Sequence, residues 1–166
     1  MRGEPVPRPC ARVLVVGPGD TLLLLRYRTA PGAVGDYCWL TPGGGIRPGE
    51  APADAAAREL REETGIWVSP DELGPVIATA SGQWSSGGTV FAAHESYFHV
   101  RVPGTGVDAS GREELERSLV LGHRWWTVPE LASARERIFP VNLAGLLRSV
   151  LAAGPPAVPV RLPWSC

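Results

Sequence analysis

The sequence predicts a mixed α/β fold, with an α+β mixed sheet that contains antiparallel neighbours, and three observations lead to that class. Two apolar runs, residues 11–16 and 21–27, are separated by Gly17–Asp20, which is typical of a β-hairpin with a tight turn. An alanine-rich stretch, residues 51–64, has a high helix propensity. Leucine and valine then recur at i, i+3, i+4, i+7 and i+8 over residues 143–151, which indicates an amphipathic helix.

The remaining elements follow from shorter signals. Further strands are expected at residues 37–41, 74–80, 90–102 and 123–128. A polar loop, residues 83–88, is expected between the second and third of these. The first helix is expected to end at Gly65 and to bury a stripe formed by Ala53, Ala56, Ala57 and Leu60. We therefore expect a single domain over residues 1–166, with its core at about 11–152 and an extended or loosely packed proline-rich tail at 153–166.

Composition and charge exclude several classes of partner. The chain has 166 residues, of which 44% are hydrophobic, enough for one compact core. Its formal net charge of -1 predicts neither a nucleic-acid polymer nor an anionic membrane as partner. Apolar runs fall short of the ~18 residues that a membrane span needs, and the first ten residues lack an apolar signal core. The three cysteines are scattered and form no CxxC pair, so we expect reduced thiols and a cytoplasmic location.

The predicted helix at 51–64 carries a dense cluster of acids. Glu59, Glu62 and Glu63 are spaced i, i+3 and i+4, so their carboxylates share one face of the helix. Three like charges on one face require a cation, and a hard divalent metal such as Mg²⁺ prefers carboxylate oxygens. A carbonyl oxygen of the preceding glycine turn, that of Gly43, is expected to add a ligand. Arg58 precedes Glu62 by four residues and is expected to hold that side chain by an ion pair.

The spacing around this cluster is more specific than the cluster itself. From Gly44 to Ile66 the chain reads G-x5-E-x7-R-E-U-x-E-E-x-G-U, with an aliphatic residue at both U positions. This pattern is the Nudix signature, and the chain resembles the Nudix hydrolase family at every specified position. Residues 39–43 and 124–131 also resemble segments that flank the signature in bacterial members of the family.

The resemblance implies an α/β/α sandwich and hydrolysis of a nucleoside diphosphate linked to another moiety. It implies Mg²⁺ or Mn²⁺ as cofactor and a small-molecule nucleotide diphosphate as substrate, and the homodimer, a common state in the family, is the oligomer it suggests. The implied metal ligands are Glu59, Glu62, Glu63 and the carbonyl of Gly43. The implied catalytic residues are Arg58, Glu59 and Glu62. Gly44, Glu50 and Gly65 are expected to shape the loop–helix–loop.

Two questions stay open at this point. The general base is either Glu59 or a loop acid, with the candidates Glu113, Glu114, Glu116 and, less favoured, Glu95. The acid face alone would also fit an ordinary solvated helix face, but the complete spacing argues against it. Alternative functions are a nucleotide-binding domain without turnover and an isopentenyl diphosphate isomerase, although the cysteines and histidines offer no equivalent of the isomerase's residues.

The substrate is not selected by the signature. Arg26 and Arg28 lie near a strand end and are candidate phosphate ligands, with plain surface arginines as the alternative. Trp84 lies in a polar segment and is either a base-stacking residue or a cap on the core. The other strand tryptophans, Trp39, Trp125 and Trp126, are expected in the core. Candidate substrates are ADP-ribose, nucleoside triphosphates, dinucleoside polyphosphates and nucleotide sugars.

Overall fold

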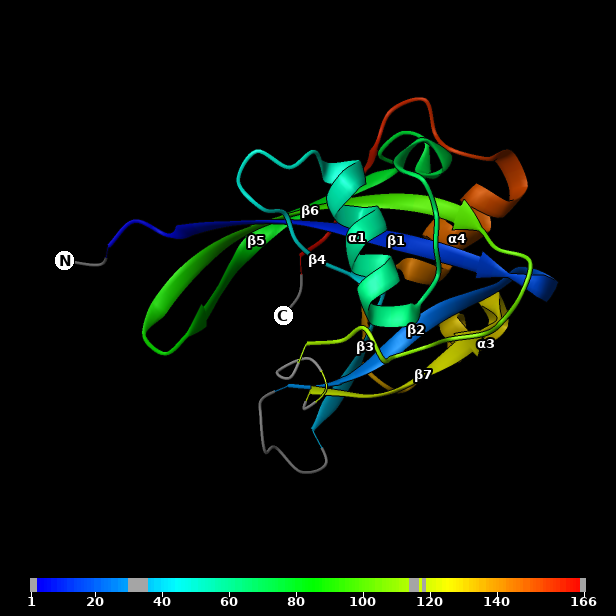
Figure 1. The fold of residues 1–166 in the computed structure, drawn as a ribbon, viewed down its shortest axis with the longest axis horizontal. Helices are drawn as coiled ribbons and strands as arrows, with labels where there is room; N and C mark the ends of the chain where they lie inside the picture. Colours follow the sequence, from blue (N-terminus) through cyan, green and yellow to red (C-terminus); the bar gives the residue numbers. More distant parts are fainter. Residues whose placement is uncertain (1–2, 30–35, 114–116, 118, 165–166) are drawn as a thin grey trace.

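A mixed sheet dominates the computed structural model, which describes residues 3–29, 36–113, 117 and 119–164. Its long strands are β1 (Val6–Gly17), β2 (Thr21–Arg28), β5 (Ala78–Ser86), β6 (Thr89–Arg101) and β7 (Val120–Trp126). Its short strands are β3 (Tyr37–Leu40), β4 (Gly43–Gly45), β8 (Ile138–Phe139) and β9 (Val160–Leu162). The order across the nine-stranded sheet is β8-β3-β2-β1-β6-β5-β9, with β4 paired to β1 and β7 paired to β2 (Figure 1).

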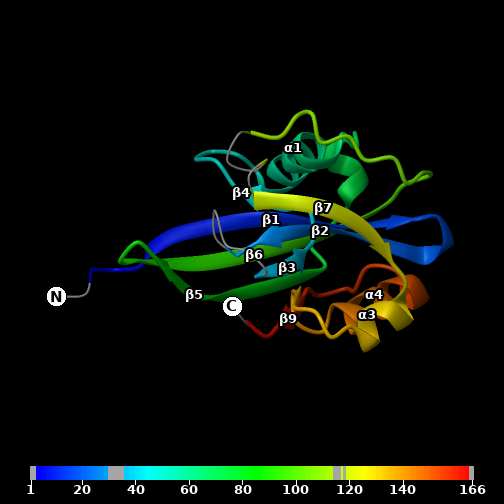
Figure 2. The same ribbon diagram turned by 90° about the horizontal axis from the view of Figure 1, so that it is seen from below.

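The sheet lies between two helical layers, as the resemblance implied. Helix α1 (Pro52–Thr64) covers one face, whereas α3 (Val128–Ser133) and α4 (Leu143–Ala153) cover the other (Figure 2). Residues of β1 contribute to the hydrophobic cores on both sides of the sheet, because the side chains of successive strand residues point to opposite faces. Val13 and Val15 pack toward α1, and Leu14 and Val16 pack toward α4. The expected α/β/α sandwich is confirmed.

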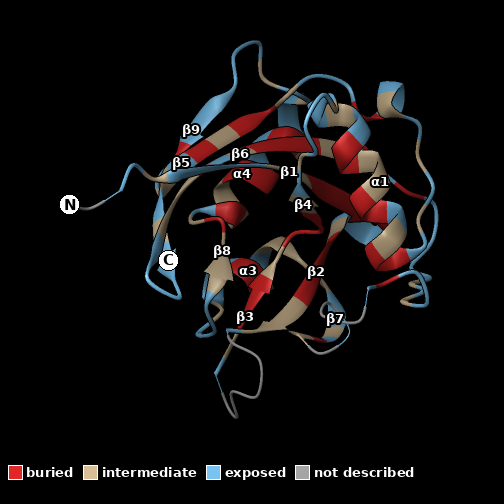
Figure 3. Ribbon diagram, turned by 60° about the vertical axis from the view of Figure 1, so that its left-hand side comes forward, coloured by how far each residue is buried: buried red, intermediate tan, exposed pale blue. Residues whose placement is uncertain are grey.

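Helix α1 has the predicted bounds to within a residue. It ends at Gly65, whose φ of 73° suits glycine and whose N–H donates to the carbonyl of Arg61 at 2.9 Å. Its buried apolar residues are Ala55, Ala56 and Leu60, with Ala53 and Ala57 partly buried beside them (Figure 3). The helix therefore packs onto the sheet with one apolar side and is fixed in place.

The predicted hairpin near the start of the chain forms at its turn, and beyond the turn its two strands separate. Val16 and Gly17 pair with Leu22 and Thr21 across the 3₁₀ turn of Pro18–Asp20. Before that point β1 pairs in parallel with β6, from Val6 opposite Phe91 to Val16 opposite Arg101. The separation of β1 from β2 leaves room for the glycine strand β4 to pair with β1.

One sequence-based expectation is wrong. The predicted polar loop at 83–88 is strand, because β5 continues to Ser86 and only Gly87 and Gly88, both at positive φ, form the turn to β6. The end of this hairpin and the start of β1 form an arm that extends from the body (Figure 1). The tail also contributes to the sheet, because β9 pairs in parallel with β5. Among the described residues, no helix has the length and apolarity that crossing a membrane would require.

Candidate active site

Arg58, in the middle of α1, joins three of the signature acids. Its guanidinium forms a fork with Glu50, with Nε and Nη2 each 2.9 Å from a carboxylate oxygen. Its Nη1 donates to Glu59 at 2.7 Å and lies 3.4 Å from Glu62, the predicted i, i+4 ion pair. Nη2 also donates to the carbonyl of Gly45 at 3.0 Å, which ties the helix to β4. The hydrogen bonds from Arg58 lower the pKa of Glu50 to about 2, so this pair is ionised at neutral pH.

Glu63 lies four residues after Glu59 on the same face of α1 and is buried. Its carboxylate accepts hydrogen bonds from the hydroxyl of Tyr27 and from the N–H of Gly43, the latter at 2.8 Å. Burial raises the pKa of Glu63 to about 7 despite both donors. Arg112, which is also buried, donates to the main-chain carbonyl of Glu63 at 3.0 Å and fixes the end of the helix.

The glycine strand needs glycine because the backbone passes close to the acids. A Cβ on Gly44 would lie 2.6 Å from the carboxylate carbon of Glu59. Gly43 has a φ of 150°, and a Cβ there would lie 2.3 Å from the carbonyl oxygen of Ala11. The predicted close approach of the glycine turn to the helix acids is therefore present.

The acids fit a hard divalent cation in their chemistry, although their side chains are held by protein donors. Glu59 and Glu62 both contact Nη1 of Arg58, so their carboxylates lie near each other. Glu63 instead accepts hydrogen bonds from Tyr27 and Gly43. Within the part of the chain that the structure describes, no three acids, histidines or cysteines are grouped closely enough to hold a metal ion. Carboxylate and carbonyl oxygens are nevertheless the donor set that Mg²⁺ and Mn²⁺ prefer.

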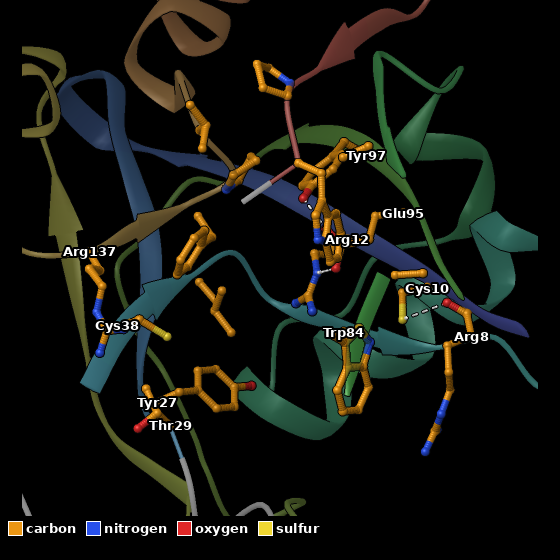
Figure 4. A pocket seen from close by; sticks show the side chains of 18 of the residues that line it. Arg8, Cys10, Arg12, Tyr27, Thr29, Cys38, Trp84, Glu95, Tyr97 and Arg137 are labelled. Carbon is orange, nitrogen blue, oxygen red and sulfur yellow. Dashed lines mark hydrogen bonds and ion pairs between the residues drawn. The ribbon is translucent and has the colours of Figure 1, made fainter. Parts of the chain in front are cut away.

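A cavity of about 530 Å³ borders these acids. Tyr27, which donates to Glu63, and Gly45, which accepts from Arg58, both line it. Its charged lining residues are mainly arginines: Arg8, Arg12, Arg28 and Arg137, with Glu95 as the acid. In Figure 4, Trp84 and Tyr27 stand on opposite sides of the cavity and the guanidinium of Arg12 points between them. An arginine-lined cavity of this size suits a phosphorylated ligand.

Arg12 is the most firmly held of these cations. Its Nε donates to Glu95 at 2.8 Å and its Nη1 to the carbonyl of Thr41 at 3.1 Å, while Tyr97 donates its hydroxyl to Glu95. Burial alone would lower the pKa of Arg12, but the Glu95 carboxylate raises it above its ordinary value. Arg12 is therefore a fixed positive charge at the cavity wall.

The structure places the predicted substrate and base residues as follows. Arg28 and Trp84 line the cavity, whereas Arg26 is not among its lining residues and lies 3.7 Å from the ring centre of Tyr37. Glu113 is exposed, and Glu114 and Glu116 lie outside the described residues. Glu95 is engaged with Arg12 in the middle of β6 rather than at a strand start. Trp39 and Trp126 are buried as expected, and Trp125 is partly buried.

Sequence reasoning missed several contributors to this region. Tyr27 was not among the predicted site residues, and strict alternation along the strand would place it on the opposite face from Arg28. A register shift between Arg26 and Tyr27 in the pairing of β2 with β7 disturbs that alternation, and both Tyr27 and Arg28 line the cavity. Arg12 could have been identified from the sequence, since it is a charged residue inside an otherwise apolar strand.

The buried carboxyl of Glu63 predicts a pH-dependent stability of the metal-free protein. A raised pKa favours the folded state when the group is protonated, so this contribution is complete below about pH 4.5 and is lost as the pH rises through about 7. We expect the free energy of unfolding of the wild type, relative to Glu63→Gln, to fall by about 2–3 kcal/mol between pH 5 and pH 8. Urea denaturation in EDTA measures it, and a constant difference across this range would contradict the prediction.

Comparison with known proteins agrees with the fold and with the family resemblance. The family model described as the NUDIX domain matches residues 6–144. Nudix hydrolase 25 of Arabidopsis thaliana is 30% identical over 106 residues, which cover 57% of each chain. An RNA pyrophosphohydrolase of Brucella ovis is 42% identical over 62 residues, covering 36% of this chain and 35% of that protein. The matches thus span only about a third to just over half the length of these relatives.

Solved structures show the same fold. A MutT protein from Methanosarcina mazei Go1 superposes with a TM-score of 0.65 at 16% identity, covering 90% of this chain and 96% of the other. At that identity the likeness concerns the fold alone. The match of the family model over most of the chain, together with the complete signature on α1, shows that the chain belongs to the Nudix family.

Proposed function

We propose that the protein is a Nudix pyrophosphohydrolase that uses Mg²⁺ or Mn²⁺ to hydrolyse the pyrophosphate bond of a nucleoside diphosphate linked to another moiety. The observation that carries the proposal is the Arg58 fork, which gathers Glu50, Glu59 and Glu62 beside the glycine strand and next to an arginine-lined cavity. The names of the Arabidopsis and Brucella relatives, a Nudix hydrolase and a pyrophosphohydrolase, support the reaction class.

Each part of the site has a role in this reaction. Glu59, Glu62 and Glu63, with the carbonyl of Gly43, would hold the metal. When bound, the metal neutralises the pyrophosphate and lowers the pKa of a water. Arg58 keeps Glu59 and Glu62 turned toward the glycine strand, and it is a positioning residue because Glu50 and Gly45 hold it in place. Arg12 and Arg28 on the cavity wall would bind the phosphates of the substrate.

The general base must take a proton from the attacking water. Glu62 is the most accessible of the three signature acids on α1, with its side chain 23% exposed against 10% for Glu59, while Glu63 is buried. Its contact with Arg58 is also the longest of that residue's ion pairs, at 3.4 Å. Glu62 is therefore the helix carboxylate with the most freedom to reach a water, whereas Glu95 is committed to Arg12 and Tyr97.

A panel of diphosphates tests the proposed function. We expect ADP-ribose, a nucleoside triphosphate, a dinucleoside polyphosphate or a nucleotide sugar to be cleaved at pH 7 and 8.5 with Mg²⁺ or Mn²⁺. Mass analysis of the products should show cleavage at a P–O–P linkage, and EDTA should abolish it reversibly. Undiminished cleavage in EDTA would exclude the metal-dependent mechanism, and no cleavage of any compound would exclude the proposed activity.

A further inference from the structure

The cavity has a floor of small side chains on the face of the sheet turned away from α1. Ala80 on β5, Ala93 on β6 and Cys10 on β1 line the cavity together with Gly45 of β4. The strand register brings these residues together, because Gly82 pairs with Ala93, Ala93 with Arg8, and Glu95 with both Ala80 and Cys10. The small side chains of this floor leave room for a flat group to lie on the sheet beside Glu95.

One aromatic wall of this floor comes from the arm. Trp84 lines the cavity and stacks on Phe91 of β6, with ring centres 4.4 Å apart and planes at 25°. The guanidinium of Arg8 lies 5.1 Å from the centre of the Phe91 ring on the same arm. Phe91 and Arg8 thus support Trp84 from behind, so its ring is held in position without a ligand.

A second aromatic wall comes from the tail. The pairing of β9 with β5 leads the chain to Trp164, which lines the same cavity. Its indole lies directly over Gly82, where a Cβ would be 2.1 Å from Cγ of the ring. The indole nitrogen is buried and has no hydrogen-bond partner among the described residues, so packing alone holds this ring. Gly82 and Trp84 lie two residues apart on one face of β5, so the two tryptophans are neighbours.

We propose that Trp84 and Trp164 form an aromatic binding site for the base of a nucleotide substrate, with the C-terminal segment as one of its walls. This inference rests on the proposed function, whose substrate it describes further. The tryptophans line the same cavity as Tyr27 and Gly45, which contact the signature helix, so a base held by the tryptophans places its phosphates toward the acids.

The chemistry of this site also predicts how selective it is. Stacking recognises the π-face that every base has, so it tolerates different bases. The site therefore requires a base but discriminates weakly between purines and pyrimidines.

Calorimetric titration tests the site directly. The probes are ADP, GDP, CDP, UDP and inorganic pyrophosphate, each added to the full chain in EDTA so that binding is measured without turnover. We expect all four nucleotides to bind more tightly than pyrophosphate. We expect Trp84→Leu and Trp164→Leu each to weaken nucleotide binding by about tenfold to a hundredfold, while pyrophosphate binding is unchanged. Trp164→Phe, which keeps an aromatic ring, should retain most of the affinity.

Two further variants separate a binding role from a general structural one. Gly82→Ala keeps both tryptophans but displaces the Trp164 ring, and we expect it to weaken nucleotide binding as Trp164→Leu does. Trp67→Leu is the matched control, because Trp67 is 75% exposed and is not among the cavity's lining residues. Thermal unfolding of each variant shows whether it is folded.

The outcomes distinguish this inference from the proposed function. Pyrophosphate binding as tightly as all four nucleotides, or unchanged nucleotide affinity in both folded tryptophan-to-leucine variants, would overturn the base site. So would the absence of measurable nucleotide binding to the wild type. Base-dependent binding that needs both tryptophans supports the site even if no compound is hydrolysed, in which case the proposed hydrolase activity alone fails.

Discussion

Glu62→Gln is expected to lower kcat for any cleaved diphosphate by about 10²- to 10⁴-fold, the range by which a positioned acid–base group accelerates reactions. Gln keeps the shape of the side chain but removes the charge that would hold the metal and accept a proton. The fold should be unaffected, because the contact with Glu62 is the longest of the Arg58 ion pairs and the Glu62 side chain is partly exposed. Steady-state kinetics at saturating Mg²⁺ measure the loss.

Asp54→Asn is the matched control for this substitution. Asp54 lies in the first turn of the same helix, where it is exposed, and the ion pairs of Arg58 are made with Glu50, Glu59 and Glu62 instead. The control removes the same charge from α1, so its kcat should stay within about twofold of wild type. Equal activity in Glu62→Gln and Asp54→Asn would remove Glu62 from the catalytic set.

Arg58→Ala is expected to lower the free energy of unfolding by about 1–3 kcal/mol, because it leaves the part-buried carboxylates of Glu50 and Glu59 without their charged hydrogen-bond partner. The side chains of Arg58, Glu50 and Glu59 are only 14%, 16% and 10% exposed. Activity should also fall by at least tenfold, because Glu59 loses the contact that turns it toward Gly44. Arg58→Lys should recover little, since an ammonium does not reproduce the two parallel bonds to Glu50.

Chemical denaturation of Arg58→Ala and of a neighbouring control measures this effect. Arg61→Ala is suited as control, because Arg61 is exposed on the same helix and packs its guanidinium 4.4 Å from the ring centre of Trp67. Its substitution should cost about 1 kcal/mol at most. Adding Glu50→Gln to Arg58→Ala should restore part of the lost stability, and a further loss instead would show that Glu50 is not paired as described.

Local signals in the sequence were enough to predict α1 and its surroundings. The alanine-rich run, the glycine after it and the signature spacing all describe neighbours along the chain, and α1 indeed ends at Gly65 with Arg58 near Glu62. The α/β/α layering followed from the family resemblance, and it depends on apolar patterns such as Val13 and Leu14 facing opposite layers.

The remaining features of the fold and of the site depend on contacts between distant parts of the chain, which no local pattern shows. Tyr27 meets Glu63 across 36 positions of sequence. The end of β5 looked like a loop because one of its faces is exposed and the other lines a cavity, so apolar alternation is absent there. The tail strand gave no signal either, since proline-rich sequence flanks only three paired residues, Val160–Leu162.

The extended geometry of strand β1 has a consequence for substrate choice. Cys10 to Arg12 pair with Gly45 to Gly43 next to the acids, and Arg8 and Arg12 of the same strand line the cavity. An extended strand rises about 3.3 Å per residue, so the segment from Arg8 to Arg12 spans about 13 Å without slack. This segment fixes the distance between the two ends of the site. We therefore expect the protein to prefer diphosphates in which the length between the base ring and the scissile bond matches that distance.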